Sequence, residues 1–408
     1  MNKEPLRYAI LEDQEAFLNL EEGWDGLCDA LGDEVTVFAS FMWYRNWWRF
    51  YGAEAKLRLF AMWEGDTLAG IAPLMWKRDS LYGIPVRRIG FMQNNQSLHN
   101  DFIVKPEHRA VFLQKLIQSF FEQSARWDVL YFRNLPVKSQ NYGSLVEILA
   151  AEGKSWKQGP NPIDSPYLIP SGDWPGFIAG RSRRTRKALN NIQNRIRKAG
   201  KVSVKHIGTW EEFLSCKDDV FAVAQKSWTE RFGDSLGSPA NKNFFKSLAF
   251  DAAAKGWLSV WVLYLDGKMI AVEFHLKAYG KEHALRGHYH PEFASLSPGT
   301  FLEMTILEHV FKERERVQVY DFCGSFENYK KKWTDTFSPH CDIHIFKDQI
   351  YSKLIRFHEV TIEPRIKMAI HYAKLLRPSK PRIGENENLK LANSQNDFLQ
   401  NHQILSKG

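Results

Sequence analysis

Two segments of the sequence, 202 residues apart, share one pattern of apolar and polar positions. Leu57–Leu74 reads LRLFAMWEGDTLAGIAPL, and Ser259–Leu276 reads SVWVLYLDGKMIAVEFHL. In each segment an acid-glycine pair separates two runs of strand-forming residues, which predicts a β-hairpin. Because each half of the chain carries one such segment, the pattern indicates an internal duplication.

Each hairpin is followed by a segment with helical spacing and then by a short apolar run. Helices are predicted over about Glu107–Trp127 and Phe301–Arg316, with strands starting near Asp128 and Val317. A helix between two strands forms a crossover, and a crossover implies parallel pairing. We therefore expect an α/β fold with mixed sheets, in two halves of the same design.

Proline and glycine interrupt the pattern between the halves. The segment Gly159–Gly176, GPNPIDSPYLIPSGDWPG, predicts a loop-rich boundary. We expect a first domain over residues 1–176 and a second over 177–350. The remainder, 351–408, predicts a helix that reaches about Leu376 and then a polar, disordered tail.

Composition places the chain among folded globular proteins, since 44% of its 408 residues are hydrophobic and 25% are charged. No stretch approaches about 18 uninterrupted apolar residues, and the first residues lack the apolar region of a secretion signal. We therefore expect a cytoplasmic protein without a transmembrane segment. The four cysteines show no zinc-ligand spacing, which predicts reduced thiols and no metal.

One segment accounts for all of the net charge of +8, because residues 181–201 contain nine basic residues and no acid. Leu189, Ile192 and Ile196 form an apolar stripe, and Gly200 follows as a helix end, which predicts an amphipathic helix with an exposed basic face. Such a face is either a solvated surface or a docking surface for an anion, such as a phosphate-bearing cofactor, nucleic acid or lipid headgroup. The lack of a known nucleic-acid-binding module argues against nucleic acid.

The string Ser297-Pro298-Gly299-Thr300 predicts a helix start directly after a strand. Either Ser297 caps the helix with Pro298 in the first position, or Thr300 caps it together with Glu303. Free N–H groups at a helix start bind anions, and glycine lets a phosphate approach the backbone closely. The alternative is an ordinary cap and turn.

Glu273 and His275 alternate along the second hairpin and therefore lie on the same face of a strand. Either side chain could accept a proton from an attacking group, although polar residues are also normal on the outer face of a sheet. Across the duplication the corresponding residues are Ile71 and Pro73, which cannot accept a proton. If one half is catalytic, we expect it to be the second.

Three further candidates follow the second crossover helix. Asp321 is a base or an ion-pair partner of a lysine. The Tyr329 phenol could protonate a leaving group, and the Lys330 ammonium could hold a phosphate or an acidic group. The alternative for Tyr329-Lys330-Lys331-Lys332-Trp333 is a solvated basic turn with Trp333 in the core.

Short motifs in a fixed order extend over most of the chain: Trp43, Trp47, Trp48, Gly65, Ile71-Ala72-Pro73-Leu74 and Asp101-Phe102 in the first half, then Ser182-Arg183-Arg184-Thr185-Arg186, Ser227-Trp228, Asp266-Gly267, Ile270-Ala271, Ser297-Pro298-Gly299, Asp321-Phe322, Gly324, Tyr329-Lys330 and Trp333. In this order the chain resembles the tandem GNAT-type acyltransferases of the CelD-like group. That group is linked to bacterial cellulose biosynthesis and is distantly related to the Fem-type peptidyl transferases.

The resemblance implies two tandem GNAT-like domains, of which the first is degenerate and the second catalytic. It implies transfer of an acyl group, such as acetyl, from acyl-CoA to an amine or hydroxyl of a polar, saccharide-related acceptor, without a metal. The residues that match it are Glu273 or Asp321 as base, Tyr329 as acid, and Ser297, Gly299, Thr300 and Lys330 at the cofactor. One departure is that the phosphate-binding loop has one glycine where the family has two.

Two other functions remain open. The missing glycine would suit a non-catalytic accessory or scaffold protein that associates with a polysaccharide-synthesis complex. A Fem-like transferase would use aminoacyl-tRNA, with the basic helix as the tRNA contact, but the sequence lacks the heptad run of the helical arm in Fem-type proteins.

Overall fold

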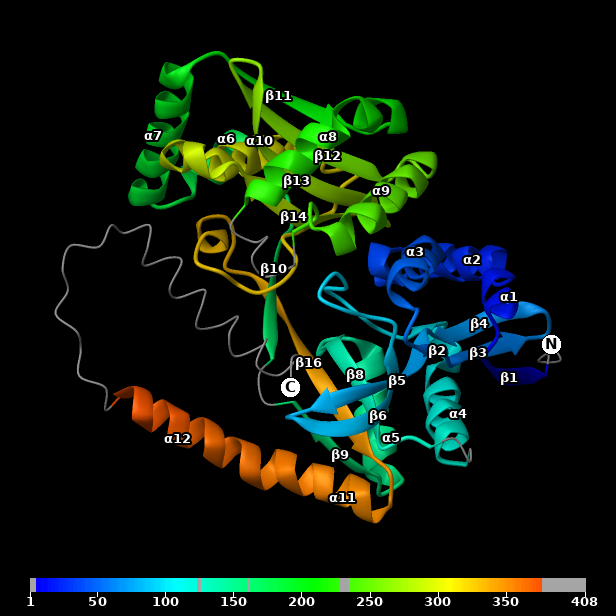
Figure 1. Cartoon of the computed structure of the whole chain (residues 1–408). Coiled ribbons are helices and arrows are strands. Elements are labelled where there is room, and N and C mark those ends of the chain that lie inside the picture. The colour runs from blue at the N-terminus through cyan, green and yellow to red at the C-terminus, as the bar shows by residue number, and fades with distance from the viewer. Residues whose placement is uncertain (1–4, 123–125, 160–161, 228–234, 376–408) are drawn as a thin grey trace.

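The computed structural model describes residues 5–122, 126–159, 162–227 and 235–375, and its two halves lie side by side (Figure 1). The elements of the first half are β1 (Leu6–Leu11), α1 (Gln14–Leu18), α2 (Glu21–Leu31), η1 (Gly32–Glu34), η2 (Val37–Ala39), α3 (Phe41–Tyr51), β2 (Lys56–Leu57), β3 (Leu59–Glu64), β4 (Thr67–Ala72), β5 (Leu74–Leu81), β6 (Ile84–Phe91), β7 (Ile103–Val104), η3 (Pro106–His108), α4 (Arg109–Glu122), β8 (Val129–Pro136), α5 (Gln140–Ala151) and β9 (Ser155–Gln158).

The second half and the C-terminal part follow in chain order. Their elements are β10 (Ile163–Leu168), α6 (Trp174–Ala179), α7 (Arg183–Ala199), β11 (Val202–Ile207), α8 (Trp210–Lys226), α9 (Pro239–Ala254), β12 (Leu258–Leu265), β13 (Lys268–Ala278), β14 (Lys281–Tyr289), η5 (Pro291–Leu296), α10 (Pro298–Lys312), β15 (Val319–Asp321), η6 (Lys330–Lys332), β16 (Phe337–Phe346), α11 (Ile350–Phe357), η7 (His358–Ile362) and α12 (Glu363–Leu375).

The two halves repeat one strand pattern, as the sequence predicts. Both hairpins are present, as β3–β4 and β12–β13. Both crossovers are present too, because β6 pairs with β8 in parallel around α4, and β14 pairs with β15 in parallel around α10. In the first half Pro73 separates β4 from β5, whereas β13 runs unbroken.

The expected loop at Gly159–Gly176 is wrong in part, because this segment contains β10 and the start of α6. Strand β10 pairs with β15 on one side and with β16 on the other. Strand β16 continues the larger sheet by pairing with β8 of the first half. Within the described residues, twelve strands thus form one sheet across both halves, in the order β11-β12-β13-β14-β15-β10-β16-β8-β6-β5-β2 with β9 beside β16. The division at residues 176 and 350 stays a prediction.

Helices cover both faces of the second-half sheet, and this arrangement sorts the side chains of β13. Val272 and Phe274 pack in the core beneath α8 and α9. Ala271 faces α10 instead, in a separate core. The first core also joins the halves, since the ring of Trp43 on α3 meets the edge of Phe244 on α9 with centroids 5.5 Å apart. Because side chains alternate along a strand, Glu273 and His275 lie on the same face of β13 as Ala271, the face that α10 covers.

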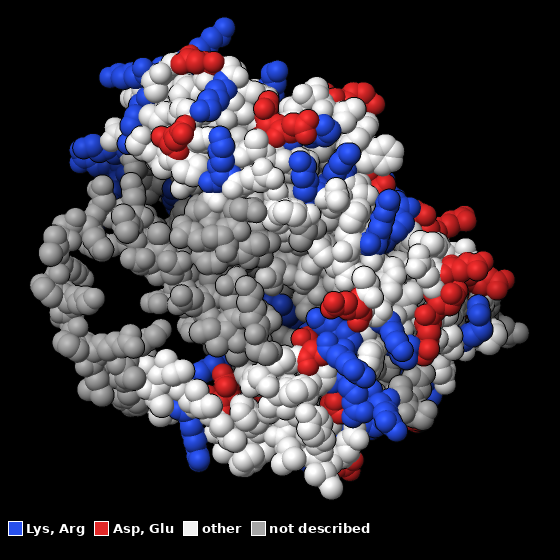
Figure 2. All heavy atoms as spheres, in the orientation of Figure 1, with Lys and Arg blue, Asp and Glu red and all other residues white. Residues whose placement is uncertain are grey.

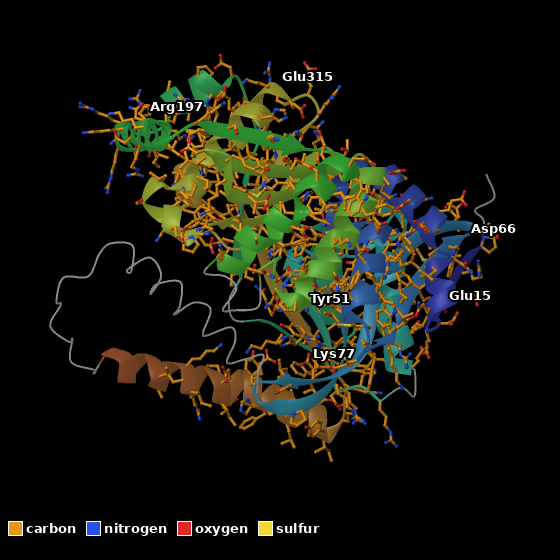
Figure 3. All side chains as sticks on the ribbon, turned by 45° about the horizontal axis from the view of Figure 1, so that its top comes forward. Glu15, Tyr51, Asp66, Lys77, Arg197 and Glu315 are labelled. Carbon is orange, nitrogen blue, oxygen red and sulfur yellow. The ribbon has the colours of Figure 1, made fainter. Side chains whose placement is uncertain are left out.

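Helix α7 is the basic amphipathic helix that the sequence predicts. Leu189 and Ile196 are buried against the domain, and the positively charged side chains are exposed. Figure 2 shows Lys and Arg side chains gathered at this end of the molecule, and Figure 3 shows Arg197 pointing outward from it. Helix α7 packs against α10, whose start lies at the candidate site.

The C-terminal part begins with the helical segment that the sequence predicts, as α11, η7 and α12. Its apolar side chains include Ile350, Leu354 and Phe357, which are exposed. The predicted disordered tail falls outside the described residues. Among the helices of the described ranges, none is long and apolar enough to cross a bilayer.

Candidate active site

Strands β14 and β15 separate after a short pairing. Their parallel register covers Lys281–His283 against Val319–Asp321, after which β14 continues beside β13 while the other chain turns away. The turn uses left-handed backbone at Cys323 (φ 52°) and Gly324 (φ 61°). The two strands therefore diverge beyond His283 and Asp321.

Helix α10 begins after β14 and η5, with Ser297 as its N-cap and Pro298 in its first turn. The cap residue is left-handed (φ 55°), and its side chain makes no capping hydrogen bond. The alternative in which Thr300 and Glu303 form a capping box is therefore wrong. At Gly299 the nearest atom to an added Cβ would be Cδ1 of Tyr289, at 3.8 Å, so the backbone there is accessible.

Two cationic side chains from different elements contact this uncapped start. Arg195 of α7 donates a hydrogen bond from Nη2 to the Ser297 hydroxyl at 3.0 Å. Lys332 of η6 donates from Nζ to the Thr300 hydroxyl at 3.2 Å. Neither cation was identified from the sequence as a site residue, although Arg195 belongs to the basic run and Lys332 to the lysine-rich turn. Together with free backbone N–H groups they favour an anion at the helix start.

A buried carboxylate–imidazole–carboxylate network lies on the α10 side of the sheet. His275 Nε2 is 3.1 Å from Glu273 Oε2, and His275 Nδ1 is 3.0 Å from Glu282 Oε1. Burial alone would lower the pKa of His275, but the two carboxylates raise it to about 10. For Glu282, burial opposes ionisation, but the contact with His275 lowers the pKa to about 2. His275 is thus a cation that holds the Glu273 carboxylate in place.

Glu303 of α10 is a second acid close to Glu273. Burial, followed by the charge of Glu273, raises the pKa of Glu303 to about 8, and its Oε1 accepts a hydrogen bond of 2.7 Å from the Tyr320 hydroxyl. Glu303 therefore carries a proton at neutral pH, next to the buried side chain of Glu273. A buried acid with a strongly raised pKa beside a second carboxyl group is typical of acid-base sites.

Tyr329 and Lys330 also reach this region. Although 44% of Tyr329 is exposed, partial desolvation and the carboxylates of Glu327, Glu303 and Glu273 raise its pKa well above the usual range, so the phenol keeps its proton. Lys330 is buried, and its ammonium donates hydrogen bonds to the carbonyl oxygens of Cys323 at 2.6 Å and Ser325 at 3.0 Å. Lys330 thereby holds the turn that follows β15.

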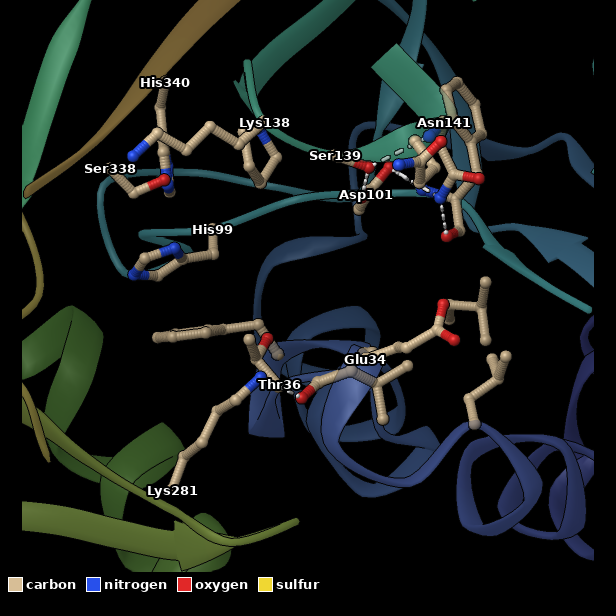
Figure 4. A pocket seen from close by; sticks show the side chains of 18 of the residues that line it. Glu34, Thr36, His99, Asp101, Lys138, Ser139, Asn141, Lys281, Ser338 and His340 are labelled. Atoms are coloured by element: carbon tan, nitrogen blue, oxygen red, sulfur yellow. Dashed lines mark hydrogen bonds between the residues drawn. The ribbon is translucent and has the colours of Figure 1, made fainter. Parts of the chain in front are cut away.

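Asp321 lies on the opposite face of β15 from Tyr320, because neighbouring strand residues alternate. It faces the first half, where its Oδ2 is 3.1 Å from Nε2 of His99. Burial would raise its pKa, but His99 and His283 keep it below the usual range. Asp321 also lines a cavity of about 560 Å³ between the halves, shown in Figure 4. The structure therefore brings Glu273 and Tyr329 close to Glu303 of α10, the helix that also contains Thr300. Asp321 lies on the other face of the sheet.

Residues 183–331 match the acetyltransferase (GNAT) domain family. The second half carries a GNAT-type acetyltransferase domain. In this GNAT domain the match covers the network on β13, the start of α10, the point where β14 and β15 diverge, and Lys330. Among curated proteins, no sequence matches significantly.

Solved structures extend the likeness over both halves and show the fold. The crystal structure of FemX aligns with a TM-score of 0.57 at 14% identity, covering 86% of this chain and 99% of that chain. The C-terminal DUF2156 domain of a putative lysylphosphatidylglycerol synthetase from Agrobacterium fabrum gives 0.51 at 9% identity, covering 83% and 95%. A conserved protein of unknown function from Bacteroides thetaiotaomicron gives 0.50 at 12% identity, covering 84% and 100%. The narrower resemblance to the CelD-like group stays a prediction.

Glu303 is the site residue of the GNAT domain that sequence reasoning missed most clearly. The signal was an acid within the apolar run Phe301, Leu302, Met304, Ile306 and Leu307 of α10, all of them buried. A charged residue at a core position of a helix is rare unless it has a partner or a function. Its interpretation as part of a capping box hid this signal.

Proposed function

We propose that the GNAT domain transfers an acyl group from acyl-CoA to an amine or hydroxyl of a polar acceptor. One observation supports the donor: the start of α10 has no side-chain cap, is open at Gly299, and is flanked by the cations Arg195 and Lys332. A pyrophosphate matches this arrangement because it accepts hydrogen bonds from free N–H groups and balances both positive charges.

The residues proposed for the donor have separate tasks. Gly299 and Thr300 would offer backbone N–H groups, and the hydroxyl of Ser297 would lie beside the anion. Lys332 would contact it directly, while Lys330 would order the turn after β15. The point where β14 and β15 diverge would then receive the thioester next to Glu273.

Glu273 is the proposed base. Its carboxylate would accept the proton of the amine or hydroxyl as that group forms a bond to the acyl carbon, and the carbon–sulfur bond would break. Tyr329 would supply a proton to the departing sulfur, so charge balances without a covalent enzyme intermediate. His275 and Glu282 position Glu273, and the neighbouring acid Glu303, protonated at neutral pH, does not compete for the same proton.

The proposed acceptor class is polar and saccharide-related, as the resemblance to the CelD-like group implies. Association with a polysaccharide-synthesis complex belongs to the same proposal. These finer points depend on the resemblance, whereas the donor depends on the start of α10.

Calorimetric titration of acetyl-CoA and of a longer acyl-CoA into the full chain tests the donor. Gly299→Asp places a like charge against the pyrophosphate and should weaken binding by roughly tenfold or more. Gly299→Asn is the matched control, because it has the same shape without the charge, and it should bind far better than the Asp variant.

Each outcome of the titration separates the candidate functions. Binding that the Asp variant loses and the Asn variant keeps supports the proposal and justifies a screen of amino sugars and other saccharides. If neither thioester binds the wild-type chain, the proposal is wrong. Salt-sensitive binding of aminoacyl-tRNA would then favour the Fem-like transferase, and its absence would favour an accessory protein.

A further inference from the structure

A compact set of metal-ligand side chains lies outside the proposed active site. His99 comes from the chain between β6 and β7 of the first half, whereas Asp321 and Cys323 come from the end of β15 in the second. One ligand atom from each of the three residues lies within 4.8 Å of the other two, and all three residues are buried. The set lies on the face of β15 opposite Tyr320 and the α10 network.

The donor atoms suit a borderline transition metal. Imidazole nitrogen, carboxylate oxygen and thiolate sulfur are the three common ligands of Zn²⁺ in proteins. A neutral imidazole, one carboxylate and one thiolate also carry two negative charges between them. They therefore match a divalent cation, and a buried metal with these ligands leaves no net charge in the protein interior.

The backbone orients the carboxylate. The N–H of Cys323 donates a hydrogen bond of 2.8 Å to Oδ1 of Asp321, which leaves Oδ2 directed toward His99. Nε2 of His99 lies 3.1 Å from that oxygen, so two of the three candidate ligand atoms already face each other. Support of a ligand by a neighbouring hydrogen bond is typical of metal sites.

A second histidine provides an independent indication. His283 is fully buried and pairs in register with Asp321 on the neighbouring strand, so both side chains face the same side. Neither of its ring nitrogens is hydrogen-bonded to another described side chain. Buried polar groups without partners are rare and often mark a missing ion or water. The ring centroids of His283 and His340 lie 6.4 Å and 4.5 Å from that of His99.

We propose that His99, Asp321 and Cys323 bind one Zn²⁺ ion at the junction of the two halves. Three protein ligands leave one coordination position, and His99 and Asp321 both line the cavity between the halves, so this position faces a space that a water or a small ligand can enter. His340 also lines this cavity, and its ring packs edge-on against that of His99. The ion connects the halves, because its ligands come from both.

Metal binding by the purified full-length chain tests the site directly. After equilibrium dialysis against Zn²⁺, mass spectrometry of the metal content should show one ion per chain. With Co²⁺ in place of Zn²⁺, absorption should show a thiolate-to-cobalt charge-transfer band and the visible bands of four-coordinate cobalt. A chelator should remove the ion and lower the melting temperature of the wild-type chain.

Variants assign the ligands. Cys323→Ser should lose the charge-transfer band, and His99→Asn, on the other half, should weaken Co²⁺ binding by roughly tenfold or more. Cys341→Ser is the matched control, because Cys341 is also a buried free thiol but belongs to the first-half core that β16 helps to form. This variant should keep the band. Thermal melting in the presence of chelator checks that each variant folds. If Cys323→Ser does not fold, Co²⁺ binding by His99→Asn decides the test.

The result that overturns the proposal is equally specific. A wild-type chain that takes up less than stoichiometric metal, or a charge-transfer band that survives Cys323→Ser, excludes this site. Neither result depends on acyl-CoA binding or on activity, so the metal site and the proposed function can fail separately.

Discussion

The two halves of the chain share one strand pattern but not the chemistry on it. Both contain a hairpin, a third strand, a crossover helix and a parallel strand. In the second half the inner hairpin strand carries Glu273 and His275, which are buried and joined by a hydrogen bond. The first half has Ile71 and Pro73 at these positions. The shared strand pattern therefore keeps an apolar core in both halves, while only the second half carries ionisable groups at these two positions.

The starts of the two crossover helices also differ in charge, and again only the second half suits an anionic ligand. In the second half Pro298 is followed by Gly299, and two cations contact the start. In the first half Pro106 is followed by the exposed acid Glu107, and the next residue, His108, is 3.1 Å from Glu64. An acid at a helix start is good for the helix but repels an anionic ligand. The comparison predicts one donor site in the second half.

The largest expected effect is on the candidate base. Glu273→Gln keeps the shape of the side chain but removes its capacity to accept a proton, so the rate of acyl transfer should fall about 10²–10⁴-fold. Release of free CoA, measured with the best acceptor from the screen, gives this rate. Glu315→Gln is the control, since Glu315 is exposed at the surface (Figure 3) and follows the far end of α10 from the proposed site. Equal activity of Glu273→Gln and wild type would remove Glu273 from the mechanism.

The next effect is on stability. His275→Leu removes the cation between Glu273 and Glu282 and leaves two buried carboxylates without their partner. The free energy of unfolding in urea should fall by about 3–5 kcal/mol. Replacing all three residues with leucine should recover much of that loss, because an apolar set has no unpaired charge. If His275→Leu costs less than about 1 kcal/mol, the network contributes little to folding.

A smaller effect depends on pH. Glu303 has a pKa of about 8 in the folded chain against its ordinary value of 4.5. Between these values the folded chain holds a proton that the unfolded chain has lost, so this contribution to stability is complete below pH 4.5 and disappears as the pH rises to 8. Glu303→Gln lacks this contribution, and its melting temperature should fall by several degrees less than that of wild type between pH 5 and pH 8.

The control for Glu303→Gln is Glu308→Gln on the same helix. Glu308 is paired with Lys312 at 2.9 Å in a largely exposed ion pair, so its replacement should leave the pH dependence of wild type. A profile of Glu303→Gln identical to that of wild type would contradict the raised pKa.

The sequence predicted the elements that depend on local pattern. Alternation and acid-glycine turns gave both hairpins, and helical spacing gave α7 and both crossover helices, because these signals lie within about 20 residues. Strand β10 was missed since Pro166 and its neighbours indicate a loop, although a proline fits where β16 supplies the remaining hydrogen bonds. The pairing of β16 with β8 joins segments about 200 residues apart, and a local pattern does not encode it.

The sequence predicted only those parts of the candidate site whose residues lie close together along the chain. Glu273 and His275 lie on one strand, and Ser297, Gly299 and Thr300 lie in one turn. The contacts of Arg195 with Ser297, of Lys332 with Thr300 and of Tyr320 with Glu303 depend on packing between elements. Asp321 and Glu273 lie on opposite faces of the sheet, and this too depends on the fold. The pairing of β15 with β14 and β10 determines which face each β15 side chain occupies.

The smallest expected effect concerns the first helix start. Glu107→Gly copies the proline-glycine pair of the second half and removes an acid from the start of the helix, so stability should fall by about 0.5–1 kcal/mol. It should not create a second acyl-CoA site, because Arg109 at this start already has partners: it donates a hydrogen bond to Asn141 at 2.9 Å and lies 3.6 Å from Glu34. Calorimetry should therefore still give one molecule of acyl-CoA per chain. A second bound molecule would show that the acid alone keeps the first half empty, and the two halves would then differ by one charge rather than by the flanking cations.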